Sequence, residues 1–246
     1  MNAFAELTTA ALRDYGVDQL PLYENALDEA TDKVTPACGT AWYGEKYREL
    51  AGDPTWFANS LIANAAKEAE GSKLLWELGG RIGDPKISEL IRKHAIDEGR
   101  HCLYYISMIK LIFPKVGKDS IDRLKTLSPG FSVNDYPEPA EKKTSSNNVL
   151  DELIQINIGE IRTRIQQLLM RPVAMAYAPA STREKVGQLL DTLGDDETRH
   201  VAYTSQLINK AAQEDRDFVF STTIKRWLQF NELTMSEVES GTFDSH

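Results

Sequence analysis

The feature that most limits the fold of this chain is a pair of long segments that open with the same dipeptide, Asp-Pro. Asp53-Pro54 and Asp84-Pro85 each place a capping carboxylate and a proline where the first turn of an α-helix favours them. The periodicity that follows is helical, and no segment shows the sustained alternation of apolar and polar residues that is typical of strands. We therefore expect helices from 54 to the glycines at 79–80 and from 85 to about 113.

A second pair of long helices is expected over about 149–177 and, after a capping box formed by Ser181 and Glu184, up to about 213. The connection 114–148 is long and rich in proline and glycine, and connections of this length are often functional. Shorter helices are expected in the first fifty residues and over about 222–239. The chain is thus predicted to be all-α: one ferritin-like four-helix-bundle domain over 1–246, built from the hairpins 54–113 and 149–213 with extra N- and C-terminal helices.

Charge and composition exclude several classes of function. The 246 residues carry a net charge of −9, with acidic residues spread along the chain, so we expect no binding to nucleic acid. The two cysteines, Cys38 and Cys102, are too few for a cysteine-rich metal site or a disulfide framework. No apolar run approaches the roughly 18 residues of a membrane span, and the N-terminus lacks a basic leader. We expect a soluble protein of the cytoplasm.

Two pentapeptides share the pattern Asp-Glu-x-Arg-His, one over 97–101 and the other over 196–200. Positions i and i+3 of a helix lie on the same face, so Glu98 should lie beside His101, and Glu197 beside His200. One such pentapeptide should occur by chance in about one chain in a thousand, and two in corresponding places roughly a thousandfold less often. Each pair is predicted to present one carboxylate and one imidazole to a metal ion.

Each hairpin is also expected to offer a carboxylate from its first helix. The helix face through Glu68 is apolar apart from one serine, whereas the face through Glu70 carries the charges of a solvated surface, so Glu68 is predicted to point inward. In the second hairpin Glu160 lies on a mixed face that leans inward. Glu152 is the alternative there.

A glutamate followed by Asp-Glu-x-Arg-His, with the whole arrangement repeated, resembles the ferritin-like di-iron carboxylate oxygenases. Soluble methane and toluene monooxygenase hydroxylases and plant acyl-carrier-protein desaturases belong to this superfamily. In this sequence 28 residues separate Glu68 from Asp97, and 35 separate Glu160 from Asp196. The resemblance covers the four long helices, and it is specific for a metal site rather than for a substrate.

The resemblance implies two iron ions, dioxygen as a reactant, and six residues that act as both metal ligands and catalytic residues: Glu68, Glu98, His101, Glu160, Glu197 and His200. Four carboxylates and two imidazoles suit iron or manganese better than zinc or calcium, so a Mn/Fe pair is an alternative to two irons. Four glutamates also neutralise two divalent ions.

The aspartate and arginine of each pentapeptide are expected to support the ligands. Asp97 and Asp196 are predicted to accept hydrogen bonds from the ligand histidines and so fix their ring orientation. Arg100 and Arg199 should pair with these aspartates or with the opposite helix, and an unpaired surface charge is the alternative.

Three further positions carry hypotheses of their own. His94 lies one turn before Glu98 and is a candidate additional ligand. Tyr105 lies one turn after His101, as does the radical tyrosine of class I ribonucleotide reductase small subunits, although an aromatic residue there is more often part of a core. Arg164, like Arg162 and Arg171, can bind an anionic group of a substrate, such as a carboxylate, if it faces inward.

The leading functional hypothesis is a non-haem di-iron oxygenase or oxidase that activates dioxygen and hydroxylates, desaturates or N-oxygenates a small organic substrate. Its electrons would come from a separate donor, because no flavin or iron–sulfur motif is present. The alternatives are a ferritin-like iron-storage or peroxide-handling protein and a radical-generating subunit like those of ribonucleotide reductases. A homodimer is a candidate assembly for this chain.

Overall fold

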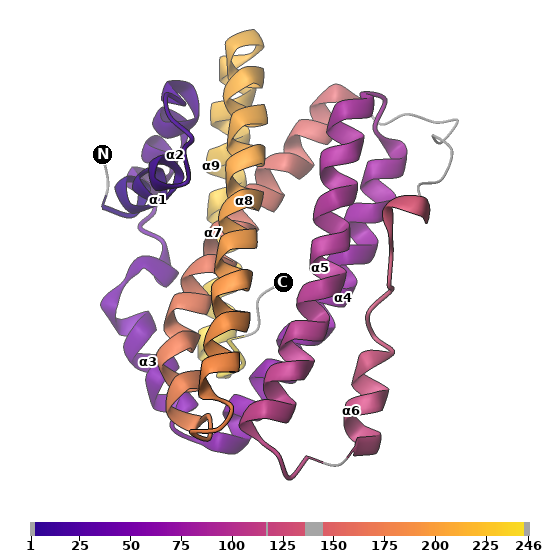
Figure 1. Ribbon diagram of the computed structural model, residues 1–246. Helices are drawn as coiled ribbons and strands as arrows, with labels where there is room; N and C mark the ends of the chain where they lie inside the picture. Colours follow the sequence, from indigo (N-terminus) through magenta and orange to yellow (C-terminus); the bar gives the residue numbers. More distant parts are fainter. Residues whose placement is uncertain (1–2, 117, 136–144, 244–246) are drawn as a thin grey trace. The chain divides into compact units, whose positions relative to one another are not determined.

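The computed structural model describes residues 3–116, 118–135 and 145–243, and within these ranges it contains nine α-helices, two short 3-10 helices and no strand (Figure 1). The prediction of an all-α helical bundle is confirmed. Contacts divide the chain into two compact units: unit 1 comprises 1–48, 146–169 and 194–245, and unit 2 comprises 49–145 and 170–193. The extent of the domain, 1–246, stays a prediction.

Unit 2 is built on the hairpin of α4 (Pro54–Arg81) and α5 (Pro85–Ile112), which lie side by side in Figure 1. Both expected helix starts are confirmed. The Asp53 carboxylate accepts a hydrogen bond from the backbone N–H of Thr55, and the Asp84 carboxylate accepts hydrogen bonds from the backbone N–H groups of the second and third residues after it. Close packing is possible because Gly79 has no side chain: a Cβ there would lie 2.7 Å from the Cγ atom of Arg92.

The connection after α5 contains structure that the sequence analysis did not predict. It forms α6 (Lys118–Lys125) and the 3-10 helix η2 (Val133–Asp135), while 117 and 136–144 lie outside the described residues. Phe131 stacks on Trp76 of α4 at 4.4 Å between ring centroids, and Ser128 donates to the Gly99 carbonyl of α5. A helix of two turns is too short to show a periodic sequence pattern, which explains why it was missed.

Unit 1 combines N-terminal helices with parts of the later ones. It contains α1 (Ala3–Asp14), α2 (Pro21–Lys33), η1 (Ala37–Gly39) and most of α3 (Ala41–Ala51). It also contains residues 146–169 of α7 (Ser146–Tyr177), residues 194–214 of α8 (Arg183–Glu214) and α9 (Arg216–Ser240). Helices α2 and α9 lie side by side (Figure 1), around an apolar core.

A buried polar network joins α7 to its neighbours in unit 1. Asn157 of α7 donates to the Thr204 hydroxyl of α8 at 2.9 Å and accepts from the Tyr23 hydroxyl of α2 at 3.0 Å. These bonds link residues far apart in the sequence and satisfy polar atoms that would otherwise be buried without partners.

Two expected helix starts differ from the structure. The capping box at Ser181 and Glu184 is wrong: α8 begins at Arg183, because the backbones of Thr182 and Arg183 both donate to the Pro179 carbonyl and close a turn there. Helix α9 begins six residues before the expected position, where Asp215 caps it. Among the described residues, no helix combines the length and the apolar character needed to cross a membrane.

Candidate metal centre

In unit 2 the structure brings together three of the predicted ligands. Glu68 comes from α4, and Glu98 and His101 come from α5 one turn apart. Each offers one ligand atom, and the three atoms lie within 4.8 Å of one another. Glu68 is 8% exposed and His101 is fully buried, whereas Glu70 is exposed, so the expected orientation of the α4 glutamates is confirmed. We call these three residues the Glu68 cluster.

The separations within the Glu68 cluster suit a shared cation better than direct hydrogen bonds. The Nδ1 atom of His101 lies 3.7 Å from Oε2 of Glu68 and 3.5 Å from Oε1 of Glu98. These distances exceed the range of about 2.7–3.2 Å of a good N–H···O bond. Two donor atoms that each lie about 2.1 Å from one metal ion are roughly 3–3.5 Å apart.

The charges of the cluster are not balanced without an added cation or proton. Burial and the negative charge of Glu98 raise the pKa of Glu68. Burial also acts to raise the pKa of Glu98, but its interactions with Glu68, His101 and His94 outweigh it, and the pKa of Glu98 falls well below its usual value. A proton on this pair is therefore favoured on Glu68 over Glu98, and a divalent cation can replace it.

His94 adds a fourth side chain to the cluster. It lies on α5 one turn before Glu98, is 1% exposed, and its Nε2 atom is 3.2 Å from Oε1 of Glu98. This contact agrees with the expectation that His94 shares the face of Glu98. Its role as a ligand stays a prediction.

Unit 1 contains a second cluster with the same arrangement, which we call the Glu160 cluster. Glu160 comes from α7, and Glu197 and His200 come from α8 one turn apart. The Nδ1 atom of His200 lies 3.6 Å from Oε2 of Glu160 and 3.3 Å from Oε2 of Glu197. Both histidines thus direct the same ring nitrogen toward two carboxylates at nearly the same distances.

Gln167 is a residue of the second site to which the sequence analysis gave no role. It is buried on α7, and its Nε2 atom donates to Oε1 of Glu197 at 2.8 Å. The signal was present, because Gln167 follows Glu160 by two helical turns and lies on its face. The corresponding position of the first repeat holds Leu75, so the two clusters differ: His94 contacts the central glutamate in one and Gln167 in the other.

The arginine of each pentapeptide pairs with its aspartate. Arg100 lies 2.7 Å from Asp97, and Arg199 lies 2.6 Å from Asp196, in both cases across one helical turn. This was one of the two expected arrangements. The hydrogen bonds expected from the histidines to the aspartates stay predictions.

The remaining candidate residues occupy different surroundings. Tyr105 is buried on α5, so a role in packing and a role as a radical site both stay open. Arg162 is buried and forms an ion pair with Glu237 of α9, which corrects the idea that it can serve a substrate. Arg171 pairs with Asp191 at the surface. Arg164 is half-buried and lines a pocket, so it is the arginine that can meet a small molecule.

Comparison with models of known protein families, with curated proteins and with solved structures finds no match for this chain. Its function is therefore inferred from the chemistry of its residues. The buried residues Glu68, Glu98 and His101 can hold a metal ion, and Glu160, Glu197 and His200 repeat their arrangement.

Proposed function

We propose that this chain is a non-haem di-iron oxygenase or oxidase that activates dioxygen and oxidises a small organic substrate. The observation that carries the proposal is the repetition of one ligand geometry. Two different pairs of helices each place a histidine Nδ1 atom 3.3–3.7 Å from two glutamate oxygens. Such repetition is typical of bundles that hold two metal ions between paired helices.

The donor set fits iron. The Glu68 and Glu160 clusters together supply four carboxylates and two imidazoles, which suit Fe²⁺ or Mn²⁺, and the four negative charges match two divalent ions. The raised pKa of Glu68 supports the fit, since a cation would remove the need for a buried proton. When bound, the iron pair supplies the electrons and the coordination sites for dioxygen activation.

The protein's own side chains prepare this chemistry. His94 and Gln167 contact the central glutamates, Glu98 and Glu197, and limit the orientations that these carboxylates can adopt. Five of the six proposed ligands are buried, with Glu197 and His200 each 1% exposed, and the side chain of Glu160 is 13% exposed. Such burial strengthens electrostatic interactions and limits side reactions with solvent.

The test is anaerobic reconstitution of the purified chain with Fe²⁺, a count of bound iron, and the visible spectrum after dioxygen is added. We expect two irons per chain and an absorbance change that depends on dioxygen. Glu98→Ala and His200→Ala should each remove that change, because each takes one ligand from one cluster. Glu70→Ala is the matched control, since Glu70 is exposed on the helix that carries Glu68, and it should behave as the unaltered chain.

Fewer than about one bound iron with no dioxygen-dependent change would refute the proposal. Two related readouts separate the alternative functions. A shell-forming oligomer on size-exclusion chromatography would indicate iron storage. A sharp tyrosyl signal in electron paramagnetic resonance that is lost in Tyr105→Phe would indicate a radical-generating subunit.

A further inference from the structure

A pocket of about 800 Å³ opens in unit 1, within the part of the chain that the structure describes. Its walls come from α1, from η1 and the start of α3, and from one face each of α7 and α8. This volume lies within the roughly 300–1,000 Å³ of typical small-molecule sites. The pocket is therefore large enough for a ligand.

Apolar side chains form most of the wall, and several are more exposed than such residues usually are. Leu7 of α1 is 71% exposed and Leu168 of α7 is 60% exposed. Phe4 and Ile161 extend the apolar lining deeper into unit 1. A group of exposed apolar side chains around a concave surface is typical of a binding site, because a bound apolar group would shield them from water.

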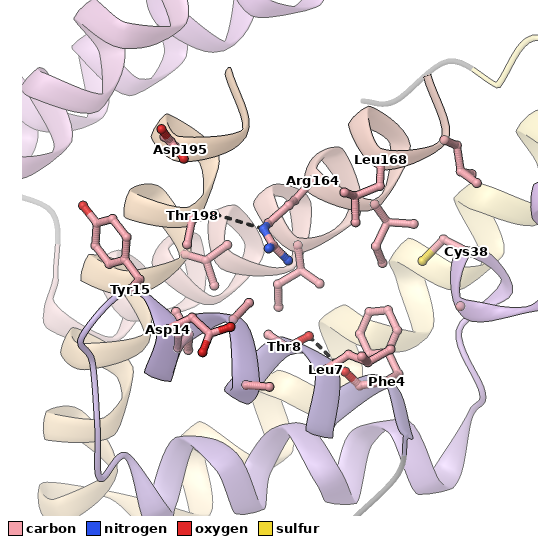
Figure 2. A pocket seen from close by; sticks show the side chains of 18 of the residues that line it. Phe4, Leu7, Thr8, Asp14, Tyr15, Cys38, Arg164, Leu168, Asp195 and Thr198 are labelled. Atoms are coloured by element: carbon pink, nitrogen blue, oxygen red, sulfur yellow. Dashed lines mark hydrogen bonds between the residues drawn. The ribbon is translucent and has the colours of Figure 1, made fainter. Parts of the chain in front are cut away.

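One cation, Arg164, points into this lining (Figure 2). Its Nε atom donates to the Thr198 hydroxyl at 3.0 Å, and that hydroxyl donates in turn to the Gly194 carbonyl at 2.7 Å. This chain of bonds fixes the plane of the guanidinium. Over the described residues Arg164 forms no ion pair, and its two terminal nitrogens donate to no protein acceptor, so they can donate in parallel to one carboxylate.

Two acidic residues limit which anion can bind. Asp14 and Asp195 also line the pocket, and both are exposed at its rim. Figure 2 shows them with Tyr15 to one side of Arg164, while Phe4, Leu168 and Cys38 lie to the other side. A ligand with one carboxylate on Arg164 meets an apolar wall on one side, whereas a second negative charge near the rim would be repelled.

We infer that this pocket binds an amphipathic monocarboxylate, with its carboxylate on Arg164 and its hydrocarbon part against the wall formed by Phe4, Leu7 and Leu168. Binding of this kind needs no metal ion. Arg164 follows Glu160 by one helical turn and Thr198 is adjacent to Glu197, so the acid would lie beside the Glu160 cluster of the same unit. If this chain is the oxygenase proposed above, the bound acid is also its substrate, and this second step rests on the proposed function.

The test uses the metal-free full chain and calorimetric titration with three probes of equal carbon number: decanoate, 1-decanol and decanedioate. We expect decanoate to bind, and the neutral and doubly charged probes to bind at least about tenfold more weakly. Arg164→Leu should weaken decanoate binding about 10- to 100-fold, because a charge-assisted pair of hydrogen bonds is lost. Arg164→Lys should restore part of the affinity, since it keeps the charge without the planar fork.

Arg171→Leu is the matched control, because Arg171 lies on the same helix but forms a surface ion pair, and it should leave decanoate affinity unchanged. Leu168→Ser tests the apolar wall. It should lower the affinity for decanoate several-fold without affecting the position of Arg164. Thermal unfolding of each variant confirms that it is folded.

Equal affinity for decanoate and decanol, an unchanged affinity in Arg164→Leu, or no binding at millimolar decanoate would overturn the inference. Because the titration contains no iron, its failure is separate from a failure of the di-iron proposal, which the iron count decides.

Discussion

Replacing Glu68 by Gln should leave the metal-free protein almost as stable as before and remove the stabilisation that metal ions give it. Burial and the charge of Glu98 raise the pKa of Glu68, which favours its protonated form. A protonated glutamate and a glutamine have similar shapes, and each can donate a hydrogen bond to Glu98. The free energy of unfolding of the metal-free protein should therefore change by less than about 1 kcal/mol.

The metal-dependent part is much larger. An ion present at one hundred times its dissociation constant stabilises the folded state by about 2.7 kcal/mol. For a chain of this size each kcal/mol raises the unfolding temperature by roughly 2–4 °C, so each bound ion should raise it by about 5–10 °C. Glutamine carries no negative charge and is a poor ligand for hard cations. The shift from the ion held by the Glu68 cluster should nearly disappear in Glu68→Gln.

The assay is differential scanning calorimetry with Mn²⁺ and, separately, with a chelator, which avoids the oxidation of Fe²⁺ in air. Glu70→Gln is the control, because this exposed residue lies on the same helix and should keep the full metal-induced shift. The reasoning is refuted if Glu68→Gln keeps the whole shift. It is also refuted if the metal-free variant is destabilised by about 3 kcal/mol or more, since Glu68 would then contribute as a charged partner.

Three further substitutions test other parts of unit 1. Gln167→Leu removes the hydrogen bond to Glu197 and should weaken metal affinity about 10- to 100-fold in an Fe²⁺ titration; an unchanged affinity would show that Gln167 does not position this ligand. Two hydrogen bonds from Arg226 lower the pKa of Asp151, so their stabilisation is present above the unfolded pKa of about 3.9 and is lost as the pH falls through the lower folded value. Urea unfolding should accordingly find Asp151→Asn less stable by at most about 1 kcal/mol at pH 7, and this difference should shrink as the pH is lowered. A difference that does not change with pH would contradict this. Asn157→Leu leaves buried hydroxyls of its network without their partner and should cost about 2–3 kcal/mol in the same assay, whereas unaltered stability would show that the network contributes nothing.

Features that depend on one helical segment could be predicted from the sequence. Asp53 and Asp84 mark the starts of α4 and α5 because an N-cap bond joins residues two or three positions apart. The same local geometry places Glu98 beside His101 and turns Glu68, rather than Glu70, away from solvent. It also places His94 on the face of Glu98.

Features that depend on how helices pack could not be predicted in this way. Arg162 and Arg164 are two positions apart and looked equivalent in the sequence, yet the first is paired with Glu237 of α9 and the second lines a pocket beside α1. The partner of Arg162 lies 75 positions away in the chain. No local pattern records which of many distant side chains will pack against a given helix face.

The sequence by itself thus determined the four long helices and the identity of the predicted ligands, because helical hydrogen bonds and i, i+3 neighbours are fixed by local backbone geometry. Tertiary structure decided the approach of the α4 and α7 glutamates to the histidines of α5 and α8, the contact of Gln167 with Glu197, and the pocket around Arg164. These depend on the rotation and register of packed helices, which the burial of apolar side chains along the whole of each helix determines.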